Sequence, residues 1–410
     1  MGLSASKSVH AWSRVAEGCG HDFASKGTCC RNRPASSHRG RLATACFLGL
    51  GLWLLVPPGH LCAESLRIAT YAAPLSRDGP GLLLRDILGR SDRQIEAVAL
   101  VLADVAADIV VLTDFDWDQD LVALQAFADL LHEMSTDYPH IFSLPPNSVL
   151  TTGLDMDGNG WLGEARDRQG YGRFAGDNGM AILSRWPIAV AGLRDLSDML
   201  WQDLPGATMP VWPDGTAFPS EVAASVQRLP SSGHWVVPVQ LPDGTELSLL
   251  VWAATPPVFD GPEDRNGLRN RDELLVWQHL LDGGMGPVPE PFVLIGNANL
   301  DPADGDGLRR EMINLLADTR LVDPLPQSEG ATRAADANHL GDPGLDTADW
   351  TGDGAGPGNL RVSYILPDAA LDVVGAGVFW PVPDEPLADL LGPDGLAAGP
   401  HHLVWVDIGR

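Results

Sequence analysis

The stretch Phe292-Val-Leu-Ile-Gly-Asn-Ala-Asn-Leu-Asp-Pro302 decides the fold prediction for this chain. Its apolar start predicts a buried strand. The carboxyl end of that strand is followed by a glycine and three polar residues: Gly296, Asn297, Asn299 and Asp301. Ligands of α/β sheets usually bind at such strand ends. Strand alternation predicts that Asn297 and Asn299 share one face, where both could contact one ligand.

Strands and helices alternate on both sides of this stretch. The apolar patterns predict strands over residues 66–71, 108–112, 180–183, 234–240, 246–252, 360–366, 371–379 and 403–408, and helices over residues 94–107, 121–131, 272–281 and 309–316. Residues 153–176, 203–220 and 330–358 are rich in Gly, Pro or Asp and predict loops. This order of elements predicts a layered α/β fold.

Residues 1–63 have the pattern of a secretory leader. Arg39 and Arg41 precede an apolar run from Leu42 to Val56, and Ala63 is the expected last residue before cleavage. An uncleaved membrane anchor is the alternative, although the run is short for a span. We therefore predict a leader over residues 1–63, one domain over residues 64–410, a secreted or periplasmic location, and no stable membrane span after cleavage.

Cysteine and charge distribution restrict the chemistry of the mature chain. All five cysteines lie before Glu64, which predicts a mature chain without disulfides or thiol chemistry. Residues 64–410 hold 20 of the 27 Lys and Arg residues and 52 of the 54 Asp and Glu residues, a net charge of −32, with no lysine. Such a surface repels nucleic acid and anionic membranes, which leaves a small phosphorylated ligand or a protein partner as the open alternatives.

Six segments together resemble one known family. In chain order they are Leu-Arg-Ile-Ala-Thr-Tyr, Asp-Ile-Val-Val-Leu-Thr-Asp, Asn-Gly-Met-Ala-Ile-Leu-Ser-Arg, Gly-Asn-Ala-Asn, Arg-Val-Ser-Tyr-Ile-Leu-Pro and His-His-Leu-Val-Trp. The chain from Leu66 to Arg410 is similar to the endonuclease/exonuclease/phosphatase superfamily, which has the DNase I-like fold. The resemblance implies an α/β (α+β) protein, a four-layered sandwich of two mixed β-sheets flanked by helices. It also implies phosphoester hydrolysis with a divalent metal ion such as Mg²⁺.

Few of the functional positions that the resemblance implies keep a usable side chain. Asp114 stands at the metal-binding position, one methylene shorter than the family's Glu, and Asn178 and Asn299 match phosphate-contacting amides. Asn297 replaces the Asp that activates water. His401 is retained at the last position of the closing motif.

The other positions depart from the family pattern. Ala72 replaces an Asn, Ala253 a His, and Ser363 and Pro400 each replace an Asp. A single Asp with amides holds Mg²⁺ poorly, and residues that act as one catalytic unit fail together. We therefore predict a pseudoenzyme with a remnant ligand-binding cleft. The alternative is an active metal-dependent phosphoesterase, acting on phosphodiesters or phosphomonoesters, with a rearranged site.

Two rearrangements would restore part of the site. Asp116, Asp118 and Asp301 could hold a relocated metal ion, although solvated loop acids are the simpler interpretation. Arg271 could bind phosphate without a metal, against the simpler interpretation of an exposed cation at a helix start.

A second metal site is predicted in the first glycine-rich loop. Asp155, Asp157 and Asn159 occupy alternate positions before Gly160, as in the first half of a calcium loop. The twelfth position is Arg166, so Glu164 or Asp167 would have to complete the ligand shell for Ca²⁺. A bare acidic turn is the alternative. His339 and His402 lack a zinc spacing and are interpreted as isolated polar residues.

Overall fold

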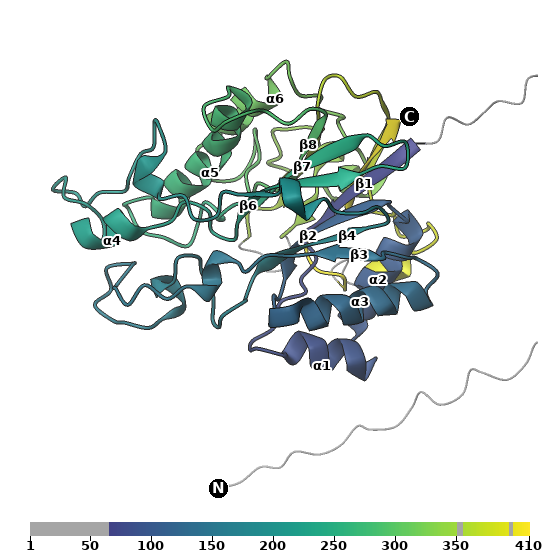
Figure 1. Ribbon diagram of the computed structural model, residues 1–410, viewed down its shortest axis with the longest axis horizontal. Coiled ribbons are helices and arrows are strands. Elements are labelled where there is room, and N and C mark those ends of the chain that lie inside the picture. The colour runs from purple at the N-terminus through teal and green to yellow at the C-terminus, as the bar shows by residue number, and fades with distance from the viewer. Residues whose placement is uncertain (1–64, 351–355, 393–396) are drawn as a thin grey trace, which may run out of the picture. The chain divides into compact units, whose positions relative to one another are not determined.

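Two β-sheets form the centre of the protein (Figure 1). The computed structural model describes residues 65–350, 356–392 and 397–410, which all belong to one compact unit, Leu61–Arg410. The predicted leader over residues 1–63 lies outside the described residues. Within the part of the chain that is described, no helix is both long and apolar enough to span a membrane.

The first sheet has six strands in the order β12-β13-β1-β2-β4-β3. Its strands are β1 (Ser65–Tyr71), β2 (Ile109–Phe115), β3 (His140–Phe142), β4 (Gly179–Ser184), β12 (Val373–Val378) and β13 (Val404–Gly409). Strands β1 and β2 are parallel, and the other pairs are antiparallel. The last strand therefore pairs with the first and closes the chain into one unit.

The second sheet has five strands in the order β11-β8-β7-β6-β5. Its strands are β5 (Arg194–Asp195), β6 (His234–Gln240), β7 (Glu246–Ala253), β8 (Phe292–Asn297) and β11 (Ser363–Pro367). Only β7 and β8 run parallel, so both sheets are mixed. A separate two-stranded sheet joins β9 (Ala348–Asp349) to β10 (Asn359–Leu360).

Helices cover the outer face of each sheet. The helices are α1 (Leu82–Gly89), α2 (Arg93–Val105), α3 (Val122–Glu133), α4 (Glu221–Val226), α5 (Arg265–Leu281), α6 (Arg310–Leu316) and α7 (Glu329–Ala334). One apolar core packs α1, α2 and α3 against the first sheet, and another packs α5 and α6 against the second. A third core fills the space between the sheets. The chain therefore has the predicted four layers.

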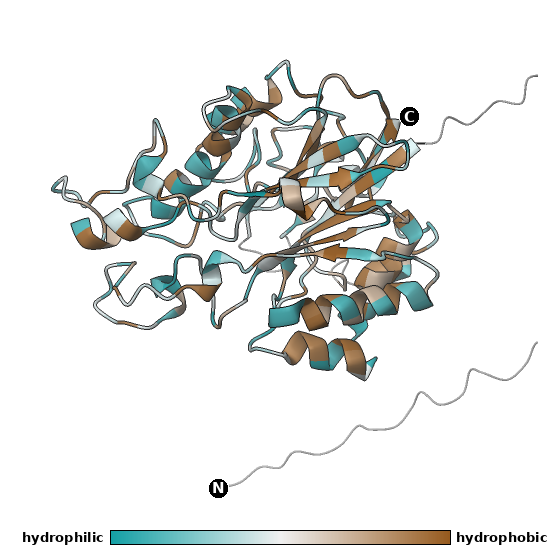
Figure 2. Ribbon diagram, viewed as in Figure 1, coloured by the Kyte–Doolittle hydropathy of each residue, from teal (hydrophilic) through white to brown (hydrophobic). Residues whose placement is uncertain are grey.

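Side chains on β8 point alternately to its two faces, so this one strand contributes to two apolar cores. On β8, Val293 and Ile295 enter the core between the sheets, whereas Phe292 and Leu294 face α5 and α6. Hydrophobic colour accordingly runs through the strands of both sheets, and α2 and α3 combine apolar and polar sides (Figure 2). Buried on both faces, β8 reads as a continuous apolar run in the sequence.

Most strands appear where the sequence predicts them, but several shorter elements differ. The hairpin of β6 and β7 matches within one residue, whereas α1, α4 and β3 carry no recognised signal. Residues 330–358 are not a simple loop, because they include most of α7 and all of β9. Helix α5 begins at Arg265, seven residues before the predicted start at Asp272.

Buried polar groups explain the early start of α5. Arg269 is 4% exposed and donates hydrogen bonds to the carbonyl oxygens of Gln169 at 2.7 Å, Leu229 at 2.8 Å and Pro230 at 3.1 Å. The first two turns of α5 therefore bury polar side chains, which hides the apolar period that marks a helix in sequence.

Candidate functional site

Three positions form one row across the second sheet. Ala253 is the register partner of Asn297, and Asn297 is the register partner of Ser363. On the same face, two residues along each strand, Ile295 and Ile365 lie in the core between the sheets. The row therefore closes the end of that core. A methyl, an amide and a hydroxyl stand where the resemblance implies a His and two Asp residues.

Asn297 and Asn299 form two hydrogen bonds with each other. The Asn297 Nδ2 donates to Asn299 Oδ1 at 3.2 Å, and the Asn299 backbone N–H donates to Asn297 Oδ1 at 2.9 Å. The Asn299 Nδ2 donates to the Ala254 carbonyl oxygen at 2.7 Å. The strand ends at Asn297, and Asn299 has a left-handed backbone with φ of 49°. A local turn, rather than strand alternation, therefore brings these side chains together.

His401, the last retained position, has no orienting carboxylate on its Nδ1 among the described residues. That atom is buried and makes no hydrogen bond among the described residues, and the Ser363 Oγ is in the same condition. The imidazole meets the Trp350 ring edge-on, with 5.1 Å between ring centroids. Burial lowers the pKa of His401 to about 4, so the ring is neutral at pH 7.

Asp114 and Asn178 meet through a serine that sequence reasoning missed. The Ser76 Oγ donates to Asp114 Oδ1 at 2.6 Å and accepts the Asn178 backbone N–H at 3.3 Å. Burial raises the pKa of Asp114 to about 6, and the nearby charge of Asp177 adds to the rise. Ser76 lies in the segment after β1, five residues beyond Tyr71, and no spacing in the sequence connects it to Asp114.

Asp116 is not a solvated loop acid, which corrects the simpler sequence interpretation. It is 5% exposed, its Oδ2 accepts the Arg77 backbone N–H at 2.9 Å, and its Oδ1 makes no hydrogen bond to any residue that the structure describes. Burial raises the pKa of Asp116 to about 7, with further contributions from Asp177 and Asp114. Both carboxyl groups are therefore buried beside other acids, in surroundings that disfavour their charged forms.

The other two acids proposed for a relocated metal have structural partners. Asp118 accepts the backbone N–H groups of Val122 at 2.6 Å and Ala123 at 2.7 Å, at the start of α3. Asp301 accepts three backbone N–H groups, which belong to Ala303, Asp304 and Arg361. These hydrogen bonds account for the positions of both carboxylates without a metal ion.

Arg271 is held in an ion pair on its own helix. Its guanidinium pairs with Asp272, whose other oxygen accepts the Trp201 indole N–H at 2.7 Å. Because α5 begins at Arg265, Arg271 lies in the second turn and is partly buried. Neither predicted role, a swinging phosphate ligand or an exposed helix-start cation, matches this position.

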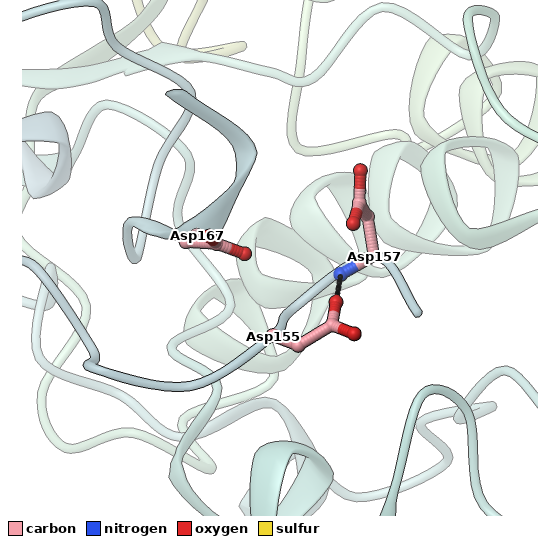
Figure 3. A group of neighbouring side chains, drawn as sticks. All are labelled: Asp155, Asp157 and Asp167. Atoms are coloured by element: carbon pink, nitrogen blue, oxygen red, sulfur yellow. Dashed lines mark hydrogen bonds between the residues drawn. The ribbon is translucent and has the colours of Figure 1, made fainter. Parts of the chain in front are cut away.

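The glycine-rich loop gathers three carboxylates. One oxygen from each of Asp155, Asp157 and Asp167 lies within 4.8 Å of the others (Figure 3). The Asp155 carboxylate also accepts the backbone N–H groups of Gly158 at 2.7 Å and Gly160 at 2.8 Å. Of the two residues expected to complete the calcium loop, Asp167 is thus the one that joins the group.

Asn159 has a different role from the one predicted. Its Oδ1 accepts the Trp161 N–H at 2.7 Å, and its Nδ2 donates to Asp157 at 3.1 Å and to Glu164 at 2.6 Å. The amide therefore presents donors to the carboxylates. Burial and the neighbouring charge of Asp155 raise the pKa of Asp157, as expected where carboxylates crowd together.

A comparison with known families identifies the family of the chain. The model of the Endonuclease/Exonuclease/phosphatase family matches residues 86–389, most of the chain. The chain belongs to this family. A search of curated proteins finds no match to it.

Several solved structures are similar to the chain. A family protein from Beutenbergia cavernae DSM 12333 has 18% sequence identity and a TM-score of 0.49, covering 84% of this chain and 72% of that one. Sphingomyelinase C from Streptomyces griseocarneus has 15% identity and a TM-score of 0.44, covering 85% of this chain and 100% of that one. A family protein from Leptotrichia buccalis C-1013-b has 13% identity and a TM-score of 0.45, covering 84% and 100%.

Proposed function

We propose that this chain is a catalytically impaired member of the endonuclease/exonuclease/phosphatase family that binds a ligand in the remnant cleft. The observation that supports it best is the row Ala253, Asn297 and Ser363, which contains no group able to take a proton from water at neutral pH. Loss of a coupled catalytic unit can reduce turnover by on the order of 10⁶-fold.

The remaining polar groups favour binding over catalysis. Neutral His401 has no carboxylate on Nδ1 among the described residues, so it lacks the partner that would orient it as a base. The Ser363 Oγ, His401 Nδ1 and Asp116 Oδ1 are buried atoms that find no hydrogen-bond partner within the described part of the chain. Such atoms gain most from a ligand or an ordered water that supplies the missing bonds.

The proposal includes a secreted or periplasmic protein whose partner is a small ligand or another protein. The leader pattern over residues 1–63 and the net charge of −32 on residues 64–410 support it. Mass determination of the secreted chain would test the location, and cleavage after Ala63 is expected. Retention of the whole chain in the membrane fraction would contradict this part of the proposal.

A hydrolysis assay tests the impaired site. We expect no turnover of chromogenic phosphomonoesters and phosphodiesters with Mg²⁺, Mn²⁺ or Ca²⁺. Turnover that disappears in Asp114→Ala would overturn the proposal. In a second arm, A253H, N297D, S363D and P400D are combined, and metal-dependent hydrolysis by this folded variant is the expected result. A folded but inactive variant would show that these positions are not the site of lost catalysis.

Thermal unfolding measures the binding part of the proposal. Phosphorylated and uncharged small molecules are each added with and without Mg²⁺, and a rise in the unfolding temperature reports binding. Ser363→Ala and Ser328→Ala form a matched pair, because Ser363 belongs to the row while Ser328 caps α7. If the rise in unfolding temperature is lost only in Ser363→Ala, the result supports ligand binding in the cleft. A rise that persists in Ser363→Ala places the ligand elsewhere.

A further inference from the structure

The chain contains three asparagines that are each followed directly by glycine. The pairs are Asn159-Gly160, Asn178-Gly179 and Asn266-Gly267. In such a pair the glycine backbone nitrogen can attack the asparagine side-chain carbonyl carbon, and the ring that forms releases ammonia. Glycine favours this attack because it has no side chain beside the nitrogen and its backbone rotates freely. Each pair is therefore chemically able to modify itself, and the fold decides which of them reacts.

Regular structure opposes the reaction at two of the pairs. Gly267 lies in α5, and the Asn266 Nδ2 donates to the Val258 carbonyl oxygen at 2.6 Å. Gly179 begins β4, is buried, and is the register partner of Phe115 on β2. Ring closure requires rotation of the backbone between the two residues, and the hydrogen bonds of a helix or a sheet resist that rotation. These two pairs therefore serve as internal comparisons for the third.

The pair Asn159-Gly160 lies in the glycine-rich loop instead. Both residues are exposed, and a Cβ atom placed on Gly160 would meet no described atom within 4 Å. Gly160 has a φ of 87°, a backbone conformation that favours glycine. The attacking nitrogen is thus free of steric cover, and water can reach a ring that forms there.

The Asn159 side chain is already folded back along the chain. Its Oδ1 accepts the Trp161 backbone N–H at 2.7 Å, so the side-chain carbonyl lies across the peptide group of Gly160. The same hydrogen bond donates to the oxygen on which negative charge develops when a nitrogen attacks the carbonyl carbon. Backbone N–H groups placed in this way stabilise such an oxygen in enzymes of acyl transfer.

Carboxylates surround the other atoms that take part in ring closure. The Gly160 backbone N–H donates to Asp155 Oδ2 at 2.8 Å, so an acceptor for its proton is in place. Asp155 comes from the same loop, beside Asp157 (Figure 3). The Asn159 Nδ2 donates to Asp157 at 3.1 Å and to Glu164 at 2.6 Å, which holds the amide in one orientation. Nucleophile, proton acceptor and carbonyl are therefore assembled before any reaction.

We propose that Asn159 is a self-modification site that the folded loop activates. The Gly160 nitrogen attacks Asn159 Cγ, and the new N–Cγ bond replaces the Cγ–Nδ2 bond. The proton of the Gly160 nitrogen passes by way of Asp155 to Nδ2, which leaves as ammonia. One water molecule then opens the cyclic imide, and residue 159 becomes aspartate or isoaspartate.

The modification changes the charge of the glycine-rich loop after folding. A carboxylate replaces the amide that donates to Asp157 and Glu164, so the loop loses both hydrogen bonds and gains a negative charge. The remnant cleft and its ligand take no part in the reaction, so the proposed function can fail while this proposal holds.

Peptide mapping by mass spectrometry follows the reaction at all three pairs. The full chain is kept at neutral pH in buffer and, in parallel, unfolded in urea, and the conversion of amide to carboxyl is measured at each asparagine. In urea the three pairs are expected to react at similar rates. General-base catalysis contributes about 10²–10⁴-fold when the base is well placed, so Asn159 is expected to react at least about tenfold faster in the folded chain than in urea. Asn178 and Asn266 are expected to react more slowly in the folded chain than in urea.

A matched pair of variants tests the role of Asp155. D155N keeps a hydrogen-bond acceptor for Gly160 but removes the base, and it is expected to slow conversion of Asn159 in the folded chain by at least about tenfold. Asp243 accepts the Thr245 backbone N–H at 2.8 Å in another exposed turn, so D243N is the control and should leave the rate unchanged.

Three results would overturn the proposal. The first is conversion of Asn159 no faster in the folded chain than in urea, which needs no variant to establish. The second is faster conversion of Asn178 or Asn266 than of Asn159 in the folded chain. The third is a folded D155N chain that converts Asn159 at the rate of the unsubstituted chain.

Discussion

Replacing Asn297 by aspartate is expected to destabilise the protein, although it restores the residue that the resemblance implies. Asn297 is 5% exposed, and its Nδ2 donates to Asn299 Oδ1 at 3.2 Å. In N297D an oxygen replaces that donor and faces the Asn299 oxygen. Asn299 cannot relieve the contact by flipping its amide, because its Nδ2 donates to the Ala254 carbonyl at 2.7 Å.

The expected cost follows from these contacts. Loss of one hydrogen bond with a buried polar atom left unsatisfied costs about 1–3 kcal/mol, and a buried charge adds to it. One bond survives, since the Asn299 backbone N–H still donates to the other oxygen of residue 297 at a distance of 2.9 Å in the parent chain. We therefore expect N297D to lower the free energy of unfolding by about 2 kcal/mol at pH 8.

The cost is expected to depend on pH. Burial should raise the pKa of the introduced carboxyl in the folded state above its value in the unfolded state, so the folded state retains a proton longer. Stability is then present below the unfolded pKa and lost as pH rises through the folded pKa. A protonated carboxyl can also donate to Asn299 Oδ1, so N297D should approach the parent stability near pH 4–5.

Urea unfolding of N297D and the parent chain at pH 5 and pH 8 measures this difference. The control is Asn338→Asp, which makes the same substitution on an exposed loop residue and should change stability little at either pH. Equal stability of N297D and the parent chain at pH 8 without added metal ion would refute the reasoning. Recovery at pH 8 only with Mg²⁺ would indicate that a metal site has been regained.

Further predictions follow from other parts of the molecule. Arg269→Met leaves several carbonyl groups in the core unpaired and should cost about 3 kcal/mol or more in urea unfolding, whereas exposed Arg310→Met should cost little. Calcium should raise the unfolding temperature by binding Asp155, Asp157 and Asp167, and a chelator or D155N should abolish the rise. A rise that survives D155N would exclude this group as the calcium site. The raised pKa values of Asp114 and Asp116, about 6 and about 7, mean that their contribution to stability is present below pH 4 and lost as pH rises to 7. D116N should reduce that part of the pH dependence. With a net charge of −32 on residues 64–410, raising salt from about 0.01 M to about 1 M shortens the Debye length from about 30 Å to about 3 Å and should stabilise the protein.

The layered fold could be predicted because its signals are local. The strand Phe292–Asn297 and the hairpin of β6 and β7 carry apolar runs and a turn that specify strands wherever they occur. The start of α5 could not be predicted, because Arg265 and Arg269 bury polar groups against loops that are distant in sequence. Apolar periodicity marks only those helix faces that pack on an apolar core.

The departures at Ala253, Asn297 and Ser363 are properties of the sequence, and so is the absence of cysteine and lysine after Ala63. Their relative positions and hydrogen bonds depend on the tertiary structure. Strand register places the three residues in one row, and a turn with positive φ at Asn299 locks the two amides together. Likewise only folding places Asp304 against His339, which lies 35 residues later in the chain. Side-chain identity is encoded locally, whereas hydrogen-bond partners, burial and the resulting pKa values arise from contacts between distant segments.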